Sequence, residues 1–447
     1  MDYANNLMQA MVLFTEWLAQ ALEALSSVDP FYADRLVAFK KLQNTAFIED
    51  QKEHYKHIPL AEILKQCTSK SYHISRPIIE KLSQEVGMKD TFCEWNPSKK
   101  ETFTFVNGLW SQAQSSFDNT CRDVQLRRLG DLSLAAQKEA LSSCMSDLAS
   151  SDDVFTTLGI MLSHETYLLE VADYAQPNKT IVIEHIITES AAHVVPRLIL
   201  KIGKESQATI IENWCSKSND LHSFVNNLTH IQLAEGGHLA YHTLYTEDPS
   251  FHQVNNIYCN QKDHSTFVHH TYAFGAAMLR MNLTVQIKGS HATAMLYGLY
   301  NLGSKEKVDH RIQVIHSHPH SLSKQHYKGI LGGQSIGSFN GKIYLTPEAQ
   351  KTNAYQTNNA IVVSDQANHF VKPQLEIYAD DVKCTHGATV GQLDTEQLLY
   401  LQTRGIPEPL AKRLLLEAFG MEIIDQVALP ELKSYLFDKL IAKLVKL

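Results

Sequence analysis

The pattern of apolar and polar positions divides the chain into three regions. In the first region, up to about residue 160, apolar residues recur at the spacing of an amphipathic helix and are interrupted by prolines and polar stretches. The helices that this pattern predicts cover 7–25, 33–44, 60–66, 77–86 and 132–149. We therefore expect an N-terminal helical domain over residues 1–160.

The second region, residues 161–392, consists of short β-prone runs separated by turn residues. Four of these runs resemble one another, each having a polar residue followed by small and β-prone residues: SQATII (206–211), HLAYHTL (238–244), STFVHH (265–270) and HATAML (291–296). A loose repeat of about 30 residues without intervening helices is typical of a β-solenoid, whose strands pair with their copies one turn away. A two-sheet sandwich with long loops is the alternative.

A buried core is expected where apolar residues of these runs face inward. The positions predicted to lie in it are Leu200, Ile210, Val285, Leu296, Ile343, Val362 and Ile377.

Helices are predicted again in the third region, residues 393–447. The first follows Asp394, which with Gln397 resembles a capping box, and is expected to end at Gly405. A second is expected from Pro409 to Gly420, and a third from Pro430 with an apolar stripe and a lysine-rich face.

Composition narrows the class of protein. Of the 447 residues, 44% are hydrophobic and 20% are charged, as in an ordinary folded protein, and the net charge of −8 argues against a basic nucleic-acid-binding surface. The seven cysteines form no CxxC pair, which excludes a zinc ribbon, a redox dithiol and a disulfide framework. The apolar N-terminus lacks a basic start and a cleavage site, so an amphipathic helix and a cytoplasmic location are expected.

Motifs for self-sufficient catalysis are absent from the sequence. The glycine-rich stretch GGQSIGSFNGK (332–342) lacks the spacing of a phosphate-binding loop and is interpreted as tight turns. No GxSxG or HExxH motif occurs, and no pair of acids can be selected for acid–base chemistry. In HSHPH (316–320), three imidazoles at alternate positions could face a metal on one strand, but Pro319 favours a solvated or hydrogen-bonded edge.

Cys384 and His386 are the remaining candidates for chemistry. Side chains two residues apart on a strand share one face, and a thiol with an imidazole could bind a soft metal. A small buried cysteine beside a hydrogen-bonded histidine is the structural alternative. Their place at the last predicted strand before the C-terminal helices matters, because an exposed sheet edge needs a cap or a partner.

The segment around these residues carries a resemblance. PQLEIYADDVKCTHGATVGQLDTEQLLYLQTRGI (373–406), together with HYKGILGGQSIGSFNGKIYL and AYQTNNAIVVSDQA upstream, resembles the SufB/SufD family, the scaffold subunits of the Suf iron–sulfur cluster assembly machinery. The run from Thr385 to Thr389 is more similar to SufD-type subunits than to SufB-type subunits, which have an EHEAT-like run there. EHYKHIPL near the N-terminus is only loosely similar to a family motif.

The resemblance implies a fold and a set of partners. The fold would be mainly β, a right-handed parallel β-helix flanked by N-terminal and C-terminal helical domains. The chain would be a non-catalytic scaffold that pairs with SufB through the end of the β-helix, or forms a homodimer when alone. It would also bind the ATPase SufC through the domain 393–447. For this docking we select Leu398, Tyr400, Leu414 and Phe419.

The resemblance also implies a site. His386 would lie at the SufB–SufD interface, where a nascent iron–sulfur cluster assembles transiently, and Cys384 is a neighbouring candidate. Such complexes have been associated with FAD, but the sequence has no local flavin motif. The alternatives are a SufB-like cluster-carrying subunit, a carbohydrate-active or adhesive β-helix, and a structural β-helix interaction protein in which Cys384 and His386 are inert.

Overall fold

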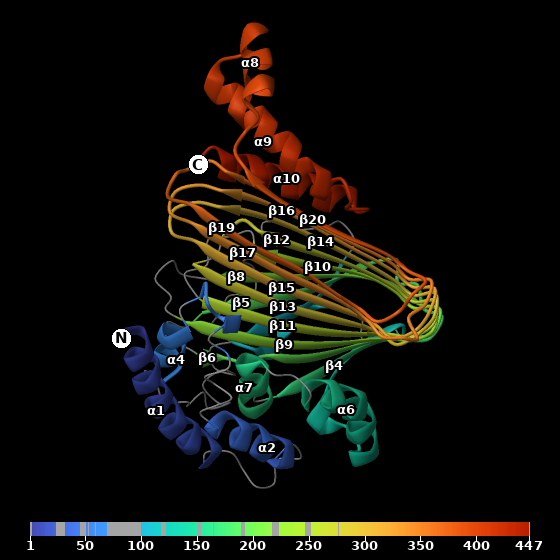
Figure 1. The fold of residues 1–447 in the computed structure, drawn as a ribbon. Helices are drawn as coiled ribbons and strands as arrows, with labels where there is room; N and C mark the ends of the chain where they lie inside the picture. The colour runs from blue at the N-terminus through green and yellow to red at the C-terminus, as the bar shows by residue number, and fades with distance from the viewer. Residues whose placement is uncertain are drawn as a thin grey trace.

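The computed structural model describes residues 2–23, 32–44, 51, 53–58, 60–68, 100–117, 122–149, 153–163, 165–188, 193–216, 223–245, 252–275 and 277–446. Within these residues two β-sheets of ten strands each face each other, with helices below and above them (Figure 1). The predicted helix 77–86 lies outside the described residues.

The first sheet runs through every second strand of the β region. Its order is β2 (Leu109–Ser116), β1 (Lys100–Val106), β5 (Thr180–Ile187), β8 (Gln207–Ser216), β10 (His238–Tyr245), β12 (Thr266–Ala273), β14 (Thr293–Leu302), β16 (Leu322–Leu331), β18 (Asn353–Val362) and β20 (Lys383–Gly391). Except for the β1–β2 hairpin, all of these neighbours pair in parallel.

The second sheet contains the strands that alternate with those of the first. Its order is β19 (Asn368–Ile377), β17 (Ile336–Leu345), β15 (Lys307–His316), β13 (Met278–Ile287), β11 (His252–Gln261), β9 (Phe224–Leu233), β7 (Arg197–Ile202), β4 (Thr166–Val171) and β3 (Val124–Arg128), with β6 (His193–Val194) beside β9. The chain thus switches sheet at each turn and pairs in parallel one turn later, which is a parallel β-solenoid. The sandwich alternative is wrong.

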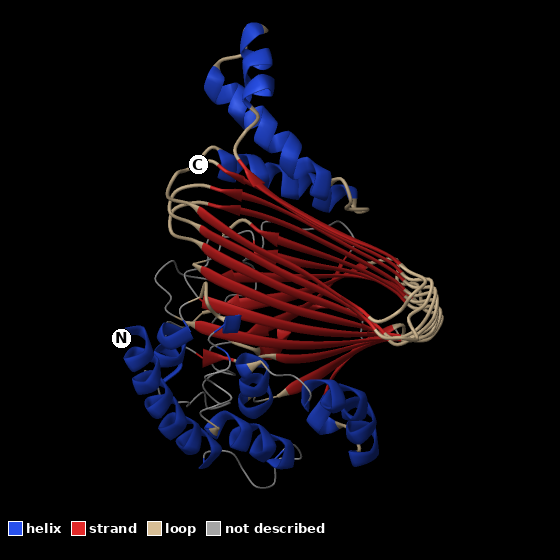
Figure 2. Cartoon of the chain, viewed as in Figure 1, coloured by secondary structure: helices blue, strands red, loops and turns tan. Residues whose placement is uncertain are grey.

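The predicted repeat is confirmed by the register of the first sheet. The four similar runs form β8, β10, β12 and β14, which are consecutive neighbours, and His238 pairs with both Gln207 and Thr266. The tight turns that lead from the second sheet to the first are stacked at the right-hand edge of Figure 2.

Inward side chains of both sheets form the largest apolar cluster. Five of the seven predicted core residues are fully buried: Leu200, Ile210, Val285, Leu296 and Ile343. Val362 is partly buried against the same core. The prediction for Ile377 is wrong, because its side chain is 39% exposed. Ile377 ends β19, and among the described residues no further strand follows β19 at that end of the second sheet.

The helices cover the outer faces of the solenoid. On the second sheet, a separate apolar cluster joins α1 (Asp2–Glu23), α2 (Tyr32–Gln43), α4 (Leu60–Thr68), α6 (Leu134–Ala149) and α7 (Val154–Leu162) to strand residues such as Ile199 and Leu228. A short 3₁₀ helix, Leu129–Asp131, precedes α6. Arg35 of α2 is buried and donates to the carbonyls of Met161 and Ser163, both at 2.6 Å.

Three strands, β1 to β3, occupy a stretch that was expected to be helical. The signal for them is present in the sequence, since Thr102–Phe105 alternates polar and aromatic residues before Asn107-Gly108. These two residues adopt φ values of 47° and 84°, as the turn of a tight hairpin requires. The division into domains at residues 160 and 392 stays a prediction.

At the other end, α8 (Thr395–Thr403), α9 (Glu408–Ile424) and α10 (Pro430–Leu444) follow β20 (Figure 1). Helices α9 and α10 bury an apolar cluster against the outer face of the first sheet, including Leu299, Ile330, Leu436 and Leu440. The expectation that the second helix ends at Gly420 is wrong. Gly420 lies inside α9, where an added Cβ would come within 2.7 Å of Leu440 Cδ2, so glycine permits the close crossing of α10.

No helix among the described residues is long and apolar enough to span a bilayer.

Candidate functional site at the last turn of the solenoid

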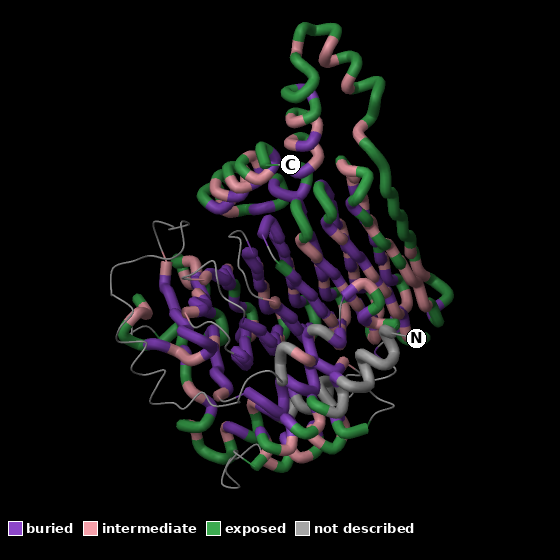
Figure 3. Tube along the Cα trace, turned by 90° about the vertical axis from the view of Figure 1, so that its left-hand side faces the viewer, coloured by how far each residue is buried: buried purple, intermediate pink, exposed green. Residues whose placement is uncertain are grey.

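The site is built on β20, the last strand of the first sheet. Within the described part of the chain β20 pairs only with β18, and eight of its nine residues, all except Cys384, are exposed, as the green end strand in Figure 3 shows. Exposure follows from position, because every earlier strand of the sheet has a neighbour on both sides except β2 at the opposite end. The edge of β20 therefore offers unpaired backbone groups to a partner.

Cys384 and His386 lie on the same side of β20, as their spacing predicts. Cys384 is in register with Ala354 and His386 with Gln356, and both of these β18 side chains are buried inside the solenoid. Neighbours in register point to the same face of a sheet, so both candidates lie above the solenoid interior at its open end. The structure thus brings the two predicted residues together.

The two side chains differ in their surroundings. Cys384 is half-buried and packs against an apolar cluster that includes Ile343 and Leu375. This burial raises the pKa of the Cys384 thiol, so the thiol form is favoured. The His386 side chain, by contrast, is exposed.

Polar side chains lie directly below this end and were not selected from the sequence. Gln356 donates through Nε2 to Gln325 Oε1 at 2.9 Å, and both are buried. Asn358 donates to the Tyr300 hydroxyl, which is 2.5 Å from His369 Nε2. Burial lowers the pKa of His369 to about 4, so its ring is neutral near pH 7. In the sequence, these residues could have been found because they occupy inward-facing, alternate positions of the strands β14, β16 and β18.

Cys384 and His386 do not by themselves complete a metal site. Among the described residues, no group of three or more His, Cys, Asp and Glu side chains is spaced to hold a metal ion. Two donors on an open strand edge leave most of the coordination sphere of a metal ion to other ligands.

HSHPH does not form a three-histidine face. β15 ends at His316, which is buried and lies 2.7 Å from Ser321 Oγ and 2.8 Å from Ser323 Oγ. Burial lowers the pKa of His316 to about 3. His318 and His320 are exposed on the following turn. The interpretation as a hydrogen-bonded and solvated edge is confirmed.

The residues selected for partner docking fall into two groups. Tyr400 on α8 and Leu414 on α9 are exposed, at 58% and 37%. Leu398 is partly buried and lines a cleft, whereas Phe419 packs on the solenoid, with Lys328 Nζ 4.1 Å from its ring centre. Sequence reasoning missed Leu399 and Leu410, which are also exposed.

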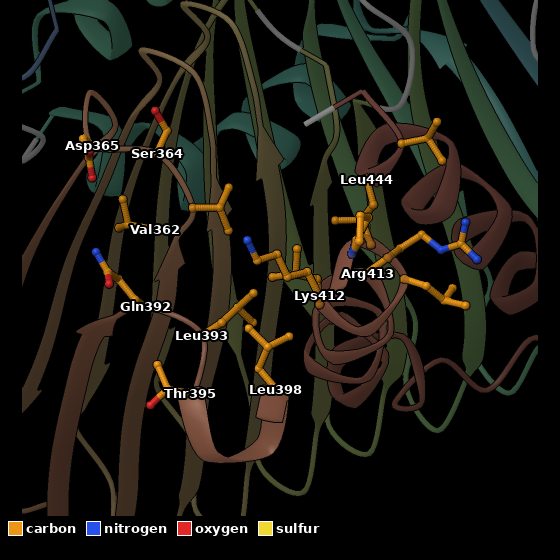
Figure 4. A pocket seen from close by; sticks show the side chains of 15 residues that line it. Val362, Ser364, Asp365, Gln392, Leu393, Thr395, Leu398, Lys412, Arg413 and Leu444 are labelled. Atoms are coloured by element: carbon orange, nitrogen blue, oxygen red, sulfur yellow. The ribbon is translucent and has the colours of Figure 1, made fainter. Parts of the chain in front are cut away.

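Helix α8 stands away from the solenoid and has no buried residue (Figure 1). It begins as predicted at Asp394, whose side chain accepts from the backbone N–H groups of Glu396 and Gln397. Between α8, α9 and the last turns lies a cleft of about 840 Å³, with Leu393, Leu398 and Val362 on its walls (Figure 4). A helix without a buried face gains stability when a partner covers it.

The fold and the open end together define a class: a β-solenoid scaffold with a donor-bearing, unpaired last strand and a projecting helix. Comparison with known proteins identifies the family. The sequence model described as "SUF system FeS cluster assembly, SufBD core domain" matches residues 185–419. The chain belongs to this SufB/SufD family of iron–sulfur cluster assembly proteins.

Relatives agree with this assignment. The chain is 32% identical to the iron–sulfur cluster assembly protein SufD of Escherichia coli over 293 residues, covering 64% of this chain and 69% of that protein. It is 27% identical over 369 residues to an iron–sulfur cluster assembly SufBD family protein of Synechocystis, covering 80% of each. It is 28% identical to SufD of Plasmodium falciparum over 255 residues, which cover 55% of this chain and 17% of that protein.

Proposed function

We propose that this chain is a non-catalytic, SufD-type scaffold subunit that pairs with a SufB-type subunit through the open end of the solenoid. The exposed edge of β20, which has a partner strand on one side only within the described parts of the chain, carries this proposal. The last turns of the solenoid also expose large apolar side chains: Tyr355, Val363, Phe370, which stacks on His57, Ile377, Tyr378 and Val390. Apolar patches of this kind are typical of protein–protein interfaces.

His386 and, less directly, Cys384 would face the partner across that interface, where the nascent iron–sulfur cluster is cargo. A neutral imidazole and a thiolate are suitable iron ligands, and the partner would supply the remaining donors. FAD, which the resemblance associates with such complexes, would bind to the assembled complex and not to a local motif of this chain.

The C-terminal helices would dock a SufC-type ATPase. Supporting this, α8 has no buried residue and exposes Leu399 and Tyr400 beside the cleft that it forms with α9. ATP hydrolysis would then belong to the partner, in agreement with the lack of a nucleotide-binding motif in the sequence.

Pairing through the open end is tested by co-purification with the SufB-type and SufC-type proteins of the same organism. The double variant Tyr378→Glu/Val390→Glu places charges in the proposed interface and should lose the SufB-type partner. Tyr174→Glu is the matched control, because Tyr174 is at least as exposed as these two residues but lies close to β4 at the opposite end of the solenoid. Retained pairing in the double variant, or an equal loss in the control, would contradict the proposal.

One alternative is a homodimer through the same edge. Light scattering on the chain alone tests this alternative. If the parent chain is a dimer and the double variant is a monomer, the edge also accepts a second copy of this chain.

A further inference from the structure

Three histidines form a stacked column on an outer corner of the solenoid, away from β20. His264, His291 and His320 lie on three successive turns that connect the second sheet to the first, the turns stacked at the right-hand edge of Figure 1. The ring centres of His264 and His291 are 5.1 Å apart, and those of His291 and His320 are 4.8 Å apart. The planes of each pair are within 3° and 6° of parallel.

The backbone fixes this column. All three residues have a positive φ, between 57° and 60°, a region in which histidine and asparagine are enriched among non-glycine residues. Each backbone N–H donates to a carbonyl of the next turn: His264 to Ser290, His291 to Pro319 and His320 to Gln350. The equivalent positions before and after the column are Gly236 and Lys351, so it is three residues long.

The imidazole nitrogens of the column are available. All three side chains are exposed, and within the described part of the chain their rings stack only on one another. His316, from the same HSHPH stretch, is by contrast buried and bonded to two serine hydroxyls. The positive φ explains why a histidine can stand at one such corner. It does not explain why exposed imidazoles stand on three consecutive turns.

We propose that this column is a binding site for a divalent first-row transition-metal ion, held by two adjacent imidazoles and by water. Imidazole is a ligand that suits zinc, nickel, copper and iron. Two nitrogens that each lie about 2 Å from one ion must approach each other to about 3 Å. In the stacked state the rings do not converge on one point, which agrees with the lack of a preformed three-ligand site among the residues that the structure describes. Exposed side chains rotate on the nanosecond scale, and one rotation in each ring brings the pair together.

The arrangement makes His291 the decisive residue. It is the neighbour of both other rings, whereas His264 and His320 are two turns apart and do not contact each other. One ion therefore binds per column, either to His264 with His291 or to His291 with His320. This inference does not depend on pairing through β20 or on the role of His386.

The test is isothermal titration calorimetry of untagged full-length protein with Zn²⁺ and, separately, Ni²⁺. Asparagine is the substitution of choice, because it tolerates the positive φ at these corners. His291→Asn removes both pairs and should weaken binding by roughly tenfold or more, since the gain from linking two donors is lost. His264→Asn and His320→Asn should each keep a pair and stay within about threefold of the parent.

Two further variants keep the test decisive. The double variant His264→Asn/His320→Asn leaves a single ring and should match His291→Asn, which covers the case in which His291→Asn folds poorly. His318→Asn removes an exposed imidazole of the same turn that stands outside the column, and should bind like the parent. Unchanged affinity in both His291→Asn and the double variant, or an equal loss in His318→Asn, would overturn the proposal.

Discussion

His386 on β20 lies in register with Gln356 on β18, yet His386 is exposed whereas Gln356 is only 1% exposed. The two residues occupy equivalent positions on successive turns of the solenoid. Gln356 is covered by the turn that contains His386, whereas no further turn among the described residues covers His386. A partner that adds a strand to β20 would therefore bring His386 toward the environment that Gln356 already has.

Replacing His386 by alanine should leave stability almost unchanged while it impairs cluster assembly. An exposed side chain contributes within about 0.5 kcal/mol to folding, so the melting temperature should stay close to that of the parent. The measurement is iron–sulfur loading of the purified complex, alongside its melting temperature and its subunit composition. Normal loading of an intact complex would remove His386 from the mechanism.

Cys384→Ser is the companion variant, with a smaller expected effect on loading. The thiol is half-buried and its pKa is raised by that burial, which disfavours the thiolate in the isolated chain. A loss of loading greater than in His386→Ala would reverse the order of importance that we assign to the two residues.

Docking of the ATPase should depend on the exposed face of α8. Leu399→Glu/Tyr400→Glu places two charges on side chains that are 60% and 58% exposed, so the fold should be unaffected and SufC-type binding should be lost. Leu134→Glu, at an equally exposed leucine on α6, is the control. These substitutions are sharper than deletion of 393–447, which would uncover the apolar face under α9 and α10. Binding that persists in the double variant would contradict docking on α8.

Much of this architecture was accessible from the sequence because a solenoid repeats its signal at every turn. The similar runs that begin β8, β10, β12 and β14 showed which strands are neighbours, and Asp394 and Gly405 marked both ends of α8. The predictions are wrong where the local sequence pattern does not show whether a neighbouring strand covers a residue. Ile377 has the alternation of a core residue, but only its place in the last turn decides that it is exposed.

The candidate site, too, could be predicted from the sequence only in part. The spacing of Cys384 and His386 placed both on one face, whereas the buried Gln325, Gln356 and Tyr300 were missed because polar residues on a strand are ordinarily expected to face solvent. The histidine column could not be predicted from HSHPH alone, since its members come from three turns that are 27 and 29 residues apart in the sequence.

Stability should fall as the pH is lowered below about 6.5. Burial lowers the pKa of His269 to about 3, of His310 to about 4 and of His316 to about 3. In the unfolded chain these rings titrate near 6.5, so between about pH 6.5 and 4 the unfolded state binds more protons. Their contribution is fully present above pH 6.5 and decreases by up to about 1.4 kcal/mol per pH unit for each ring.

Urea unfolding at a series of pH values measures this dependence. The free energy of unfolding should decrease from pH 7 to pH 5, and His316→Asn should show a smaller slope than the parent, whatever its absolute stability. A free energy that stays flat over this range would contradict the neutral, buried state of these histidines.

Glu212, inside the solenoid on β8, should be essential for stability. It is fully buried, with Oε1 2.9 Å from His185 Nε2, and Oε2 accepts from the Tyr241 hydroxyl at 2.5 Å. Glu212→Ala leaves these two partners, and Asn227, whose Nδ2 donates to Oε1 at 3.4 Å, buried without the carboxylate and should cost about 3–5 kcal/mol. Glu235→Ala, which breaks the exposed pair with Lys204, should cost about 0.5 kcal/mol or less. Urea unfolding of both variants measures the difference, and similar values would contradict this role of Glu212.

Lys328 should control how firmly α9 is held to the solenoid. Its side chain is 5% exposed, and Nζ lies 2.6 Å from Glu422 Oε2 and donates to the Phe419 carbonyl at 3.2 Å. Lys328→Met keeps most of the packing but removes both contacts, leaving that carbonyl without its lysine donor, at an expected cost of about 1–3 kcal/mol. Lys412→Met, which removes the exposed pair with Glu408 on the same helix, should have little effect. Limited proteolysis and thermal unfolding measure the outcome: Lys328→Met should be cleaved faster within α9 and α10 than Lys412→Met, because α9 would detach more often from β14 and β16. Equal cleavage of the two variants would show that the apolar cluster under these helices is sufficient to hold them.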